Sequence, residues 1–259
     1  MAKGKDALSY ALSTFLFSSI NFQNEIIKKY WEEHITNFSS IPLNKNIENP
    51  FQQVKLYFAD ESFEFDGESP EVIIFKNSIT PENKGEIILE TSSGEDCARL
   101  LCISHTIAQR FCKPICLVIS KECLNENLIS SPEHIPFPPI YEIRDQSWKP
   151  DSIRLNHPAL NFKRINYGEN MGPRDRASLL IISHGKNSSL INNLINESKI
   201  KNKVRHLEIQ TLRPISNEIL LQAMQSVKKT VVLNDTFKWL EKNNLIESIE
   251  LNQLKKLLS

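Results

Sequence analysis

Three short runs decide the fold of this chain: Leu179-Leu180-Ile181-Ile182, Val204-Arg205-His206-Leu207-Glu208-Ile209 and Thr230-Val231-Val232-Leu233. Each run has the length of a buried strand rather than that of a helix. The segments between them, 188–198 and 216–227, carry apolar residues at helical spacing. Strands that alternate with helices require a parallel sheet with helices packed on it. The sequence therefore predicts a β-α-β-α-β unit from about Ala177 to Asp235.

The N-terminal half shows a second set of strand and helix patterns. Apolar residues at helical spacing predict amphipathic helices in two segments, and continuous apolar runs predict three buried strands. Between the last two strands, Thr91–Asp96 predicts a helix start, because Ser and acidic side chains suit the free amides of a first turn. This strand-helix-strand order predicts a right-handed parallel crossover. The helices are expected at Ala7–Ile20 and Asn24–Phe38, the strands at Val72–Phe75, Glu86–Leu89 and Ile115–Ile119, and a strand with an exposed loop at Phe51–Phe65.

Prolines separate these two halves. Residues 128–173 are rich in proline and lack periodicity, which predicts an extended linker. After the last strand, apolar residues at helical spacing predict one terminal helix, on Leu245, Ile249, Leu251, Leu254 and Leu258. The predicted fold class is α/β, with two domains of parallel sheets flanked by helices, 1–127 and 174–259, joined by the proline-rich linker 128–173.

Composition narrows the classes of function. The chain has 259 residues, with 31 basic and 31 acidic side chains scattered along it, so no basic surface for nucleic acid or an anionic membrane is expected. Its seven glycines leave little room for a glycine-rich nucleotide loop. The five cysteines show no metal-binding spacing and suit reduced, buried thiols in a cytoplasmic protein. No apolar run approaches the roughly 18 residues that a membrane-spanning helix needs.

Two C-terminal stretches carry a resemblance to a known family. The run Leu207-Glu208-Ile209-Gln210-Thr211-Leu212-Arg213-Pro214-Ile215 and the run Ser226-Val227-Lys228-Lys229-Thr230-Val231-Val232-Leu233-Asn234-Asp235 resemble the C-terminal domain of transketolase-type thiamine diphosphate enzymes, above all the beta subunit of 2-oxoacid dehydrogenases. Gln210 replaces a residue that is commonly basic there. The stretch 178–185 is similar to the first strand and glycine turn of that domain. In the N-terminal half, 86–119 and 6–12 resemble parts of the pyrimidine-binding domain.

The resemblance implies thiamine diphosphate chemistry. The positions at which this chain departs from the family bear on whether the chain performs that chemistry. In the family, the pyrimidine-binding domain supplies a glutamate to the cofactor, within a stretch rich in Gly and Ala that this chain lacks between Trp31 and Gly85. Glu61, Glu64 and Glu68 are carboxylates in that region, but their acidic surroundings favour a solvated loop. The catalytic residues therefore stay unknown.

The metal-diphosphate half of the cofactor is held in the family by a glycine-aspartate-glycine and asparagine motif that this sequence lacks. Asn192-Asn193 and Asn243-Asn244 lie on expected helices without the acidic partner that a hard cation requires. No metal site and no cofactor binding are expected of the chain alone. Thiamine diphosphate with magnesium is expected only with an alpha-like partner chain, which supplies this half in dehydrogenases with separate subunits.

Four residues are candidates for a ligand or subunit contact. His184, Gly185 and Lys186 follow a strand and precede a helix, where open α/β sheets place ligands; an ordinary strand-to-helix turn is the alternative. Arg213, before Pro214, could bind a carboxylate of a substrate or partner, or could hold a loop in place. His105 is expected to be a hydrogen-bonded core residue. No Ser-His-Asp or Cys-His arrangement follows from the sequence order, and four histidines lack partners at catalytic or metal spacing: His34, His134, His157 and His206.

Two functions are compatible with these observations. The first is a divergent, non-catalytic transketolase-like protein that serves as a structural or interaction subunit, in a homo-oligomer or with an alpha-like chain. The alternative is the beta subunit of a thiamine diphosphate-dependent 2-oxoacid dehydrogenase or oxidoreductase that is active only with an alpha-like partner. Fold alone does not decide between them.

Overall fold

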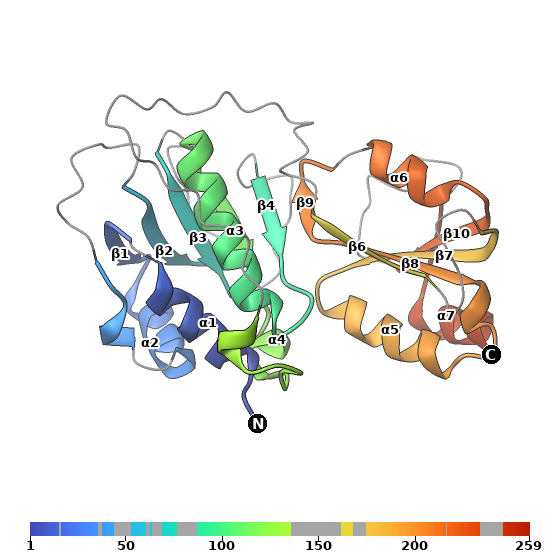
Figure 1. Cartoon of the computed structure of the whole chain (residues 1–259), viewed down its shortest axis with the longest axis horizontal. Coiled ribbons are helices and arrows are strands. Elements are labelled where there is room, and N and C mark those ends of the chain that lie inside the picture. Colours follow the sequence, from blue (N-terminus) through green and yellow to red (C-terminus); the bar gives the residue numbers. More distant parts are fainter. Residues whose placement is uncertain are drawn as a thin grey trace. The chain divides into compact units, whose positions relative to one another are not determined.

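The computed structural model describes residues 1–15, 17–35, 38–43, 53–60, 63, 69–76, 87–135, 162–167, 175–215, 217–233 and 246–259. The chain divides into two compact units, Met1–Leu160 with Thr211–Pro214 (unit 1) and Asn161–Gln210 with Ile215–Ser259 (unit 2). Each unit holds a mostly parallel sheet flanked by helices (Figure 1). The predicted α/β class, with two sheets of mainly parallel strands, is confirmed. Among the described residues no helix is long and apolar enough to cross a membrane.

Unit 1 has a six-stranded sheet in the order β1-β2-β3-β5-β4-β9. Neighbouring strands are parallel except β4 and β9, which are antiparallel. The predicted parallel pairing of the two strands on either side of α3 is confirmed by β4 and β5. The strands are β1 (Ser19–Phe22), β2 (Lys55–Ala59), β3 (Glu71–Phe75), β4 (Ile87–Glu90), β5 (Ile115–Val118) and β9 (Thr211–Arg213), and the helices are α1 (Gly4–Thr14), α2 (Glu25–His34), α3 (Asp96–Phe111) and α4 (Lys121–Asn125).

The first predicted helix is too long at its C-terminal end. The structure ends α1 at Thr14 and places β1 at Ser19–Phe22, where the sequence predicts helix as far as Ile20. Strand pairing explains the earlier end of α1, because Ile20 lies opposite Leu56 in the parallel pair of β1 and β2. Two further helices of unit 1 begin at side-chain caps, since Asn24 Oδ1 accepts from Ile27 N in α2 and Ser120 Oγ accepts from Cys123 N in α4.

Unit 2 has a five-stranded sheet in the order β11-β10-β7-β8-β6. Only the β6 and β8 pair is antiparallel among these described strands. In Figure 1, α5 and α7 cover one face of this sheet and α6 the other. The predicted β-α-β-α-β unit is present as β7, α5, β8, α6 and β10. The strands are β6 (Lys163–Tyr167), β7 (Ala177–His184), β8 (Val204–Ile209), β10 (Val227–Leu233) and β11 (Ile246–Ile249), and the helices are α5 (Lys186–Glu197), α6 (Asn217–Met224) and α7 (Leu251–Leu258).

Three segments differ from their predicted structure. β6 lies within the predicted linker, and its sequence Lys163-Arg164-Ile165-Asn166-Tyr167 lacks an apolar run because it forms an antiparallel edge. β11 lies in the segment assigned to the terminal helix; Ile246 and Ile249 are both buried, and their spacing also fits a helix. Thr211–Pro214, expected in the second domain, belongs to unit 1, where Thr211–Arg213 joins the sheet as β9. Elsewhere in the predicted linker, Pro132–His134 forms a 3₁₀ helix, and 136–161 and 168–173 lie outside the described residues.

Candidate functional site

The turn that follows β4 in unit 1 is held by acidic side chains of the chain itself. Asp96 Oδ2 accepts from Ser92 N at 3.3 Å and from Ser92 Oγ at 3.0 Å. Gly94 N donates to Glu126 Oε2 at 2.6 Å. Asp96 Oδ1 also accepts two bonds from Arg99, at 3.1 and 2.8 Å. Donors before and at the start of α3, a position that can bind an anion, are therefore occupied by carboxylates of the protein.

The thiols around this turn are unreactive by environment. All five cysteines are free. Cys123 Sγ donates to Thr91 O at 3.7 Å, and burial raises the pKa of its thiol to about 11. Burial also raises the pKa of Cys97 well above its ordinary value and that of Cys102 to about 12. Because the thiolate is the nucleophile, these three residues are packing groups, as the sequence predicts.

Three of the four candidate contact residues lie together in unit 2. His184 ends β7, Gly185 follows with φ 56°, and Lys186 opens α5 with an exposed side chain. Gly185 stands at the N-cap of α5 without a side-chain cap, and this positive φ is the physical reason for a glycine there. The fourth candidate, Arg213, lies in β9 of unit 1 and is exposed. Their role in ligand or subunit contact stays a prediction.

Sequence reasoning missed a chain of hydrogen bonds beneath α5. Ser183 Oγ lies 2.8 Å from Ser188 Oγ and 2.7 Å from His206 Nε2. His206 Nδ1 lies 2.7 Å from Asn192 Oδ1, which also accepts from Asn166 Nδ2 at 3.1 Å. Because an amide oxygen cannot donate, His206 carries its proton on Nδ1 and accepts the Ser183 hydroxyl at Nε2. The order Ser, His, Asn is that of a catalytic triad.

Burial argues against catalysis by this triad. Ser183 and Ser188 are 0% exposed and His206 is 1% exposed, so a substrate has no access to the hydroxyl in this structure. Burial also lowers the pKa of His206 to about 4. The neutral histidine therefore joins α5 to β7 and β8 as a structural network. The partners of His206 stand 14 and 23 positions away in the sequence, which explains why no spacing pattern revealed them.

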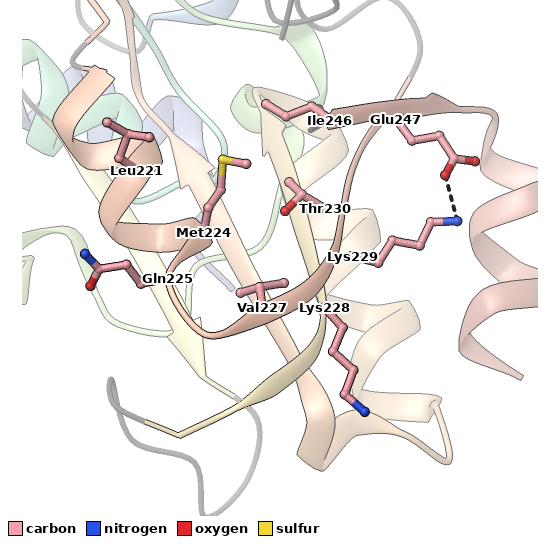
Figure 2. Close-up of a pocket in the computed structure, with 9 residues that line it drawn as sticks. All are labelled: Leu221, Met224, Gln225, Val227, Lys228, Lys229, Thr230, Ile246 and Glu247. Carbon is pink, nitrogen blue, oxygen red and sulfur yellow. Dashed lines mark ion pairs between the residues drawn. The ribbon is translucent and has the colours of Figure 1, made fainter. Parts of the chain in front are cut away.

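A cavity of about 540 Å³ lies in unit 2 between α6 and the starts of β10 and β11. Figure 2 shows its side chains, which come from α6, from the turn after it and from both strands. Lys229 Nζ and Glu247 Oε2 form an ion pair at 2.7 Å on this lining. The lining residues are Leu221, Met224, Gln225, Val227, Lys228, Lys229, Thr230, Ile246 and Glu247.

Comparison with solved structures identifies the architecture. A 2-oxoglutarate:ferredoxin oxidoreductase from Magnetococcus marinus is similar over 100% of this chain, with a TM-score of 0.64 and 10% identity. A split-gene transketolase, an inactive beta4 tetramer, is similar over 95% of this chain and 87% of its own, with a TM-score of 0.55 and 8% identity. The fold is transketolase-like. This chain spans 65% of the oxidoreductase chain. No protein-family model and no curated protein matches the sequence.

Within this transketolase-like fold, one buried carboxyl group stands at the carboxyl end of a strand of unit 1. Glu90 is the last residue of β4, lies opposite Val118 of β5 and is 4% exposed. The carboxylates considered from sequence, Glu61, Glu64 and Glu68, lie outside the described residues. Glu90 was not among them, although an acid that directly follows the apolar run 87–89 is a signal in the sequence.

The remaining predicted positions can also be placed. His105 is 5% exposed and packs against Phe15 and Phe17, with ring centroids 5.2 and 5.3 Å away, as expected of a core histidine. Gln210 Nε2 donates to Glu208 Oε1 at 3.0 Å, so both buried polar side chains have a partner. Within the described part of the chain, no group of three or more His, Cys, Asp or Glu side chains could hold a metal ion.

Proposed function

We propose that this chain is a transketolase-like subunit without catalytic activity of its own, which works by associating with further copies of itself or with a second, alpha-like chain. The proposal rests on the hydrogen bonds in the turn just before α3. Asp96 and Glu126 bond the donors of Ser92 and Gly94, in the turn after β4 where an open α/β sheet would bind a ligand. A ligand phosphate would have to displace two carboxylates there.

Similarity to the split-gene transketolase supports association. That protein is described as an inactive beta4 tetramer, and this chain covers 87% of its length. A chain that holds only part of an active site is expected to be inactive alone and to be completed by another subunit. The proposal assigns such a role to this chain, with the identity of its partner open.

Among the residues that the structure describes, none form a site that fits the metal-diphosphate half of thiamine diphosphate. A divalent cation such as magnesium needs oxygen ligands, usually one or two carboxylates besides water and phosphate. Asp96 is 0% exposed and bonded to Ser92 and Arg99, so it is not available as a ligand. We infer that the chain alone does not bind thiamine diphosphate.

A measurement of mass and cofactor binding tests this proposal. Light scattering after gel filtration should give a multiple of 29.8 kDa for the purified chain, or a heteromeric mass when an alpha-like chain is co-expressed. Titration calorimetry with thiamine diphosphate and Mg²⁺ should give no heat of binding for the chain alone. A monomer that co-purifies with no such chain, or saturable cofactor binding by the chain alone, would contradict the proposal.

Glu90 favours a second candidate, the beta subunit of a thiamine diphosphate-dependent 2-oxoacid oxidoreductase or dehydrogenase that is completed by an alpha-like chain. Glu90 is a buried carboxyl group at the carboxyl end of a parallel strand, the edge at which open α/β sheets place their ligands. The name of the oxidoreductase that shares this fold identifies 2-oxoglutarate, a 2-oxoacid, as its substrate. Here Glu90 would supply the carboxyl group that the family uses on the cofactor.

Substitution in a reconstituted complex separates the two candidates. If the second holds, Glu90→Gln should reduce 2-oxoacid turnover by about 100-fold or more, the usual effect of removing a group that transfers a proton. Glu25→Gln changes a glutamate whose side chain is 88% exposed and should leave the rate unchanged. Equal turnover by the wild type and Glu90→Gln complexes would eliminate this role for Glu90.

A further inference from the structure

Unit 2 carries basic side chains at the edge of its sheet where the parallel strands begin. β7 lies between β10 and β8 and is parallel to both, so the first residues of the three strands share one edge. Arg176 directly precedes β7, Lys203 directly precedes β8, and Lys228 is the second residue of β10. The register places Lys228 and Lys203 on either side of Ser178, with their backbones about 10 Å apart. The topology thus gathers basic residues that are far apart in the sequence.

These basic side chains face solvent without a counter-charge. Four of them, which we call the basic edge, are exposed and form no ion pair with any described residue: Arg176, Lys199, Lys203 and Lys228. Two acids, Asp175 and Glu247, lie near the same strand starts, and Glu247 is already paired with Lys229 at 2.7 Å. The basic edge therefore keeps a net positive charge that an anionic partner can neutralise.

The charge balance of the whole chain indicates what this partner is. Open α/β sheets bind small ligands beyond the carboxyl ends of their strands, whereas the basic edge lies at the amino ends, which favours contact with another macromolecule. The chain has 31 basic and 31 acidic residues, so a surplus of basic residues at one place is balanced by a surplus of acidic residues elsewhere. The densest acidic stretch of the sequence, Asp60–Glu71, has six acidic residues and no basic one, and it belongs to unit 1.

We propose that the basic edge of one copy of this chain binds the acidic stretch Asp60–Glu71 of a second copy. Because each copy carries both partners, a pair of copies can make the contact twice. Exposed ion pairs are individually weak, but several together accelerate association and make it depend on salt. This inference rests on the self-association proposed above and names the two surfaces that provide it.

Charge reversal, measured by sedimentation velocity on the full chain, tests this pairing. The double variant Lys203→Glu with Lys228→Glu should weaken self-association about 10-fold or more at low salt, because attractive contacts become repulsive. The double variant Glu61→Lys with Glu64→Lys should have the same effect from the other side. A mixture of the two variants should associate more tightly than either alone, because the unaltered basic edge of the second meets the unaltered acidic stretch of the first. Association of the mixture also shows that both variants are folded.

A matched variant and a change of salt complete the test. Lys29→Glu with Lys121→Glu changes the net charge by the same amount at two exposed lysines of unit 1 and should leave self-association unchanged. Raising NaCl from about 0.05 M to about 0.5 M shortens the screening length and should weaken wild-type association about 10-fold or more. A wild-type chain that stays monomeric at low salt would overturn both this inference and the proposed self-association. Equal association of the wild type and both charge-reversed variants would overturn this inference alone.

Discussion

Replacing Arg205 with methionine should lower the free energy of unfolding of unit 2 by about 3 kcal/mol. Arg205 lies in β8, is 2% exposed, and donates from Nη1 to Ala223 O at 2.8 Å and to Gln225 O at 3.0 Å. Its Nη2 donates to Asp175 O at 3.0 Å. Methionine fills similar space but leaves carbonyl groups without donors, and a lost buried partner costs about 1–3 kcal/mol per group.

The positions of these carbonyl groups enlarge the expected effect. Ala223 and Gln225 lie at the end of α6 and just after it, where the last carbonyl groups of a helix have no donor within the helix and the dipole favours a cation. Asp175 directly precedes the start of β7. Arg205 thus joins the end of α6 and the start of β7 to β8, so its loss should loosen all three elements.

Hydrogen exchange measured by mass spectrometry can assign this loss to unit 2. Peptides from β7 and β8 should exchange roughly 100-fold faster in Arg205→Met, since 1.4 kcal/mol corresponds to a factor of ten. The exchange rates of Arg205→Lys should lie between those of the wild type and Arg205→Met, because an ammonium group can donate to only some of the three carbonyl groups. Arg176→Met changes an exposed arginine directly before β7. The free energy of unfolding of this variant should stay within about 0.5 kcal/mol of that of the wild type. Equal protection in Arg205→Met and Arg176→Met would refute the proposed role of Arg205.

The central strands could be predicted from sequence because burial on both faces imposes a composition. β7 and β8 are almost wholly buried, and β10 is buried from Thr230 to Leu233. The apolar runs 179–182 and 231–233 lie in β7 and β10. The edge strands β6 and β11 carry no such constraint on one side, and their sequences resemble a loop and a helix. β9 was missed for another reason, since Thr211–Arg213 pairs with β4, which is more than 100 positions earlier.

The candidate sites depended on contacts that spacing does not encode. His184, Gly185 and Lys186 are consecutive, so a strand-to-helix turn could be predicted at that point. The network around His206 and the cavity around Thr230 each join residues from three elements. Both sites became visible only when the register of β7, β8, β10 and β11 was fixed. Polar residues within apolar runs, such as His206 and Thr230, were the available signal.

Acidification should destabilise unit 2 through His206. Burial lowers the pKa of this histidine in the folded protein from 6.5 to about 4. Between these values the unfolded chain binds a proton that the folded chain excludes, so stability is lost as the pH falls from about 6.5 to about 4. A pKa difference of this size corresponds to a loss of about 3 kcal/mol. Above pH 6.5 both states are neutral at this residue and the effect disappears.

Two variants isolate this contribution from that of the carboxylates, which also titrate in acid. His206→Gln removes the titrating group, so the difference in free energy of unfolding between pH 7 and pH 4 should be about 3 kcal/mol smaller than in the wild type. Asn192→Asp places a negative charge beside His206 Nδ1, which favours the protonated ring and raises its pKa. This variant should also lose less stability in acid. Hydrogen exchange of β7 and β8 at both pH values, corrected for the intrinsic rates, measures each difference. If the wild type and His206→Gln lose the same stability between pH 7 and pH 4, the neutral histidine is not what makes unit 2 sensitive to acid.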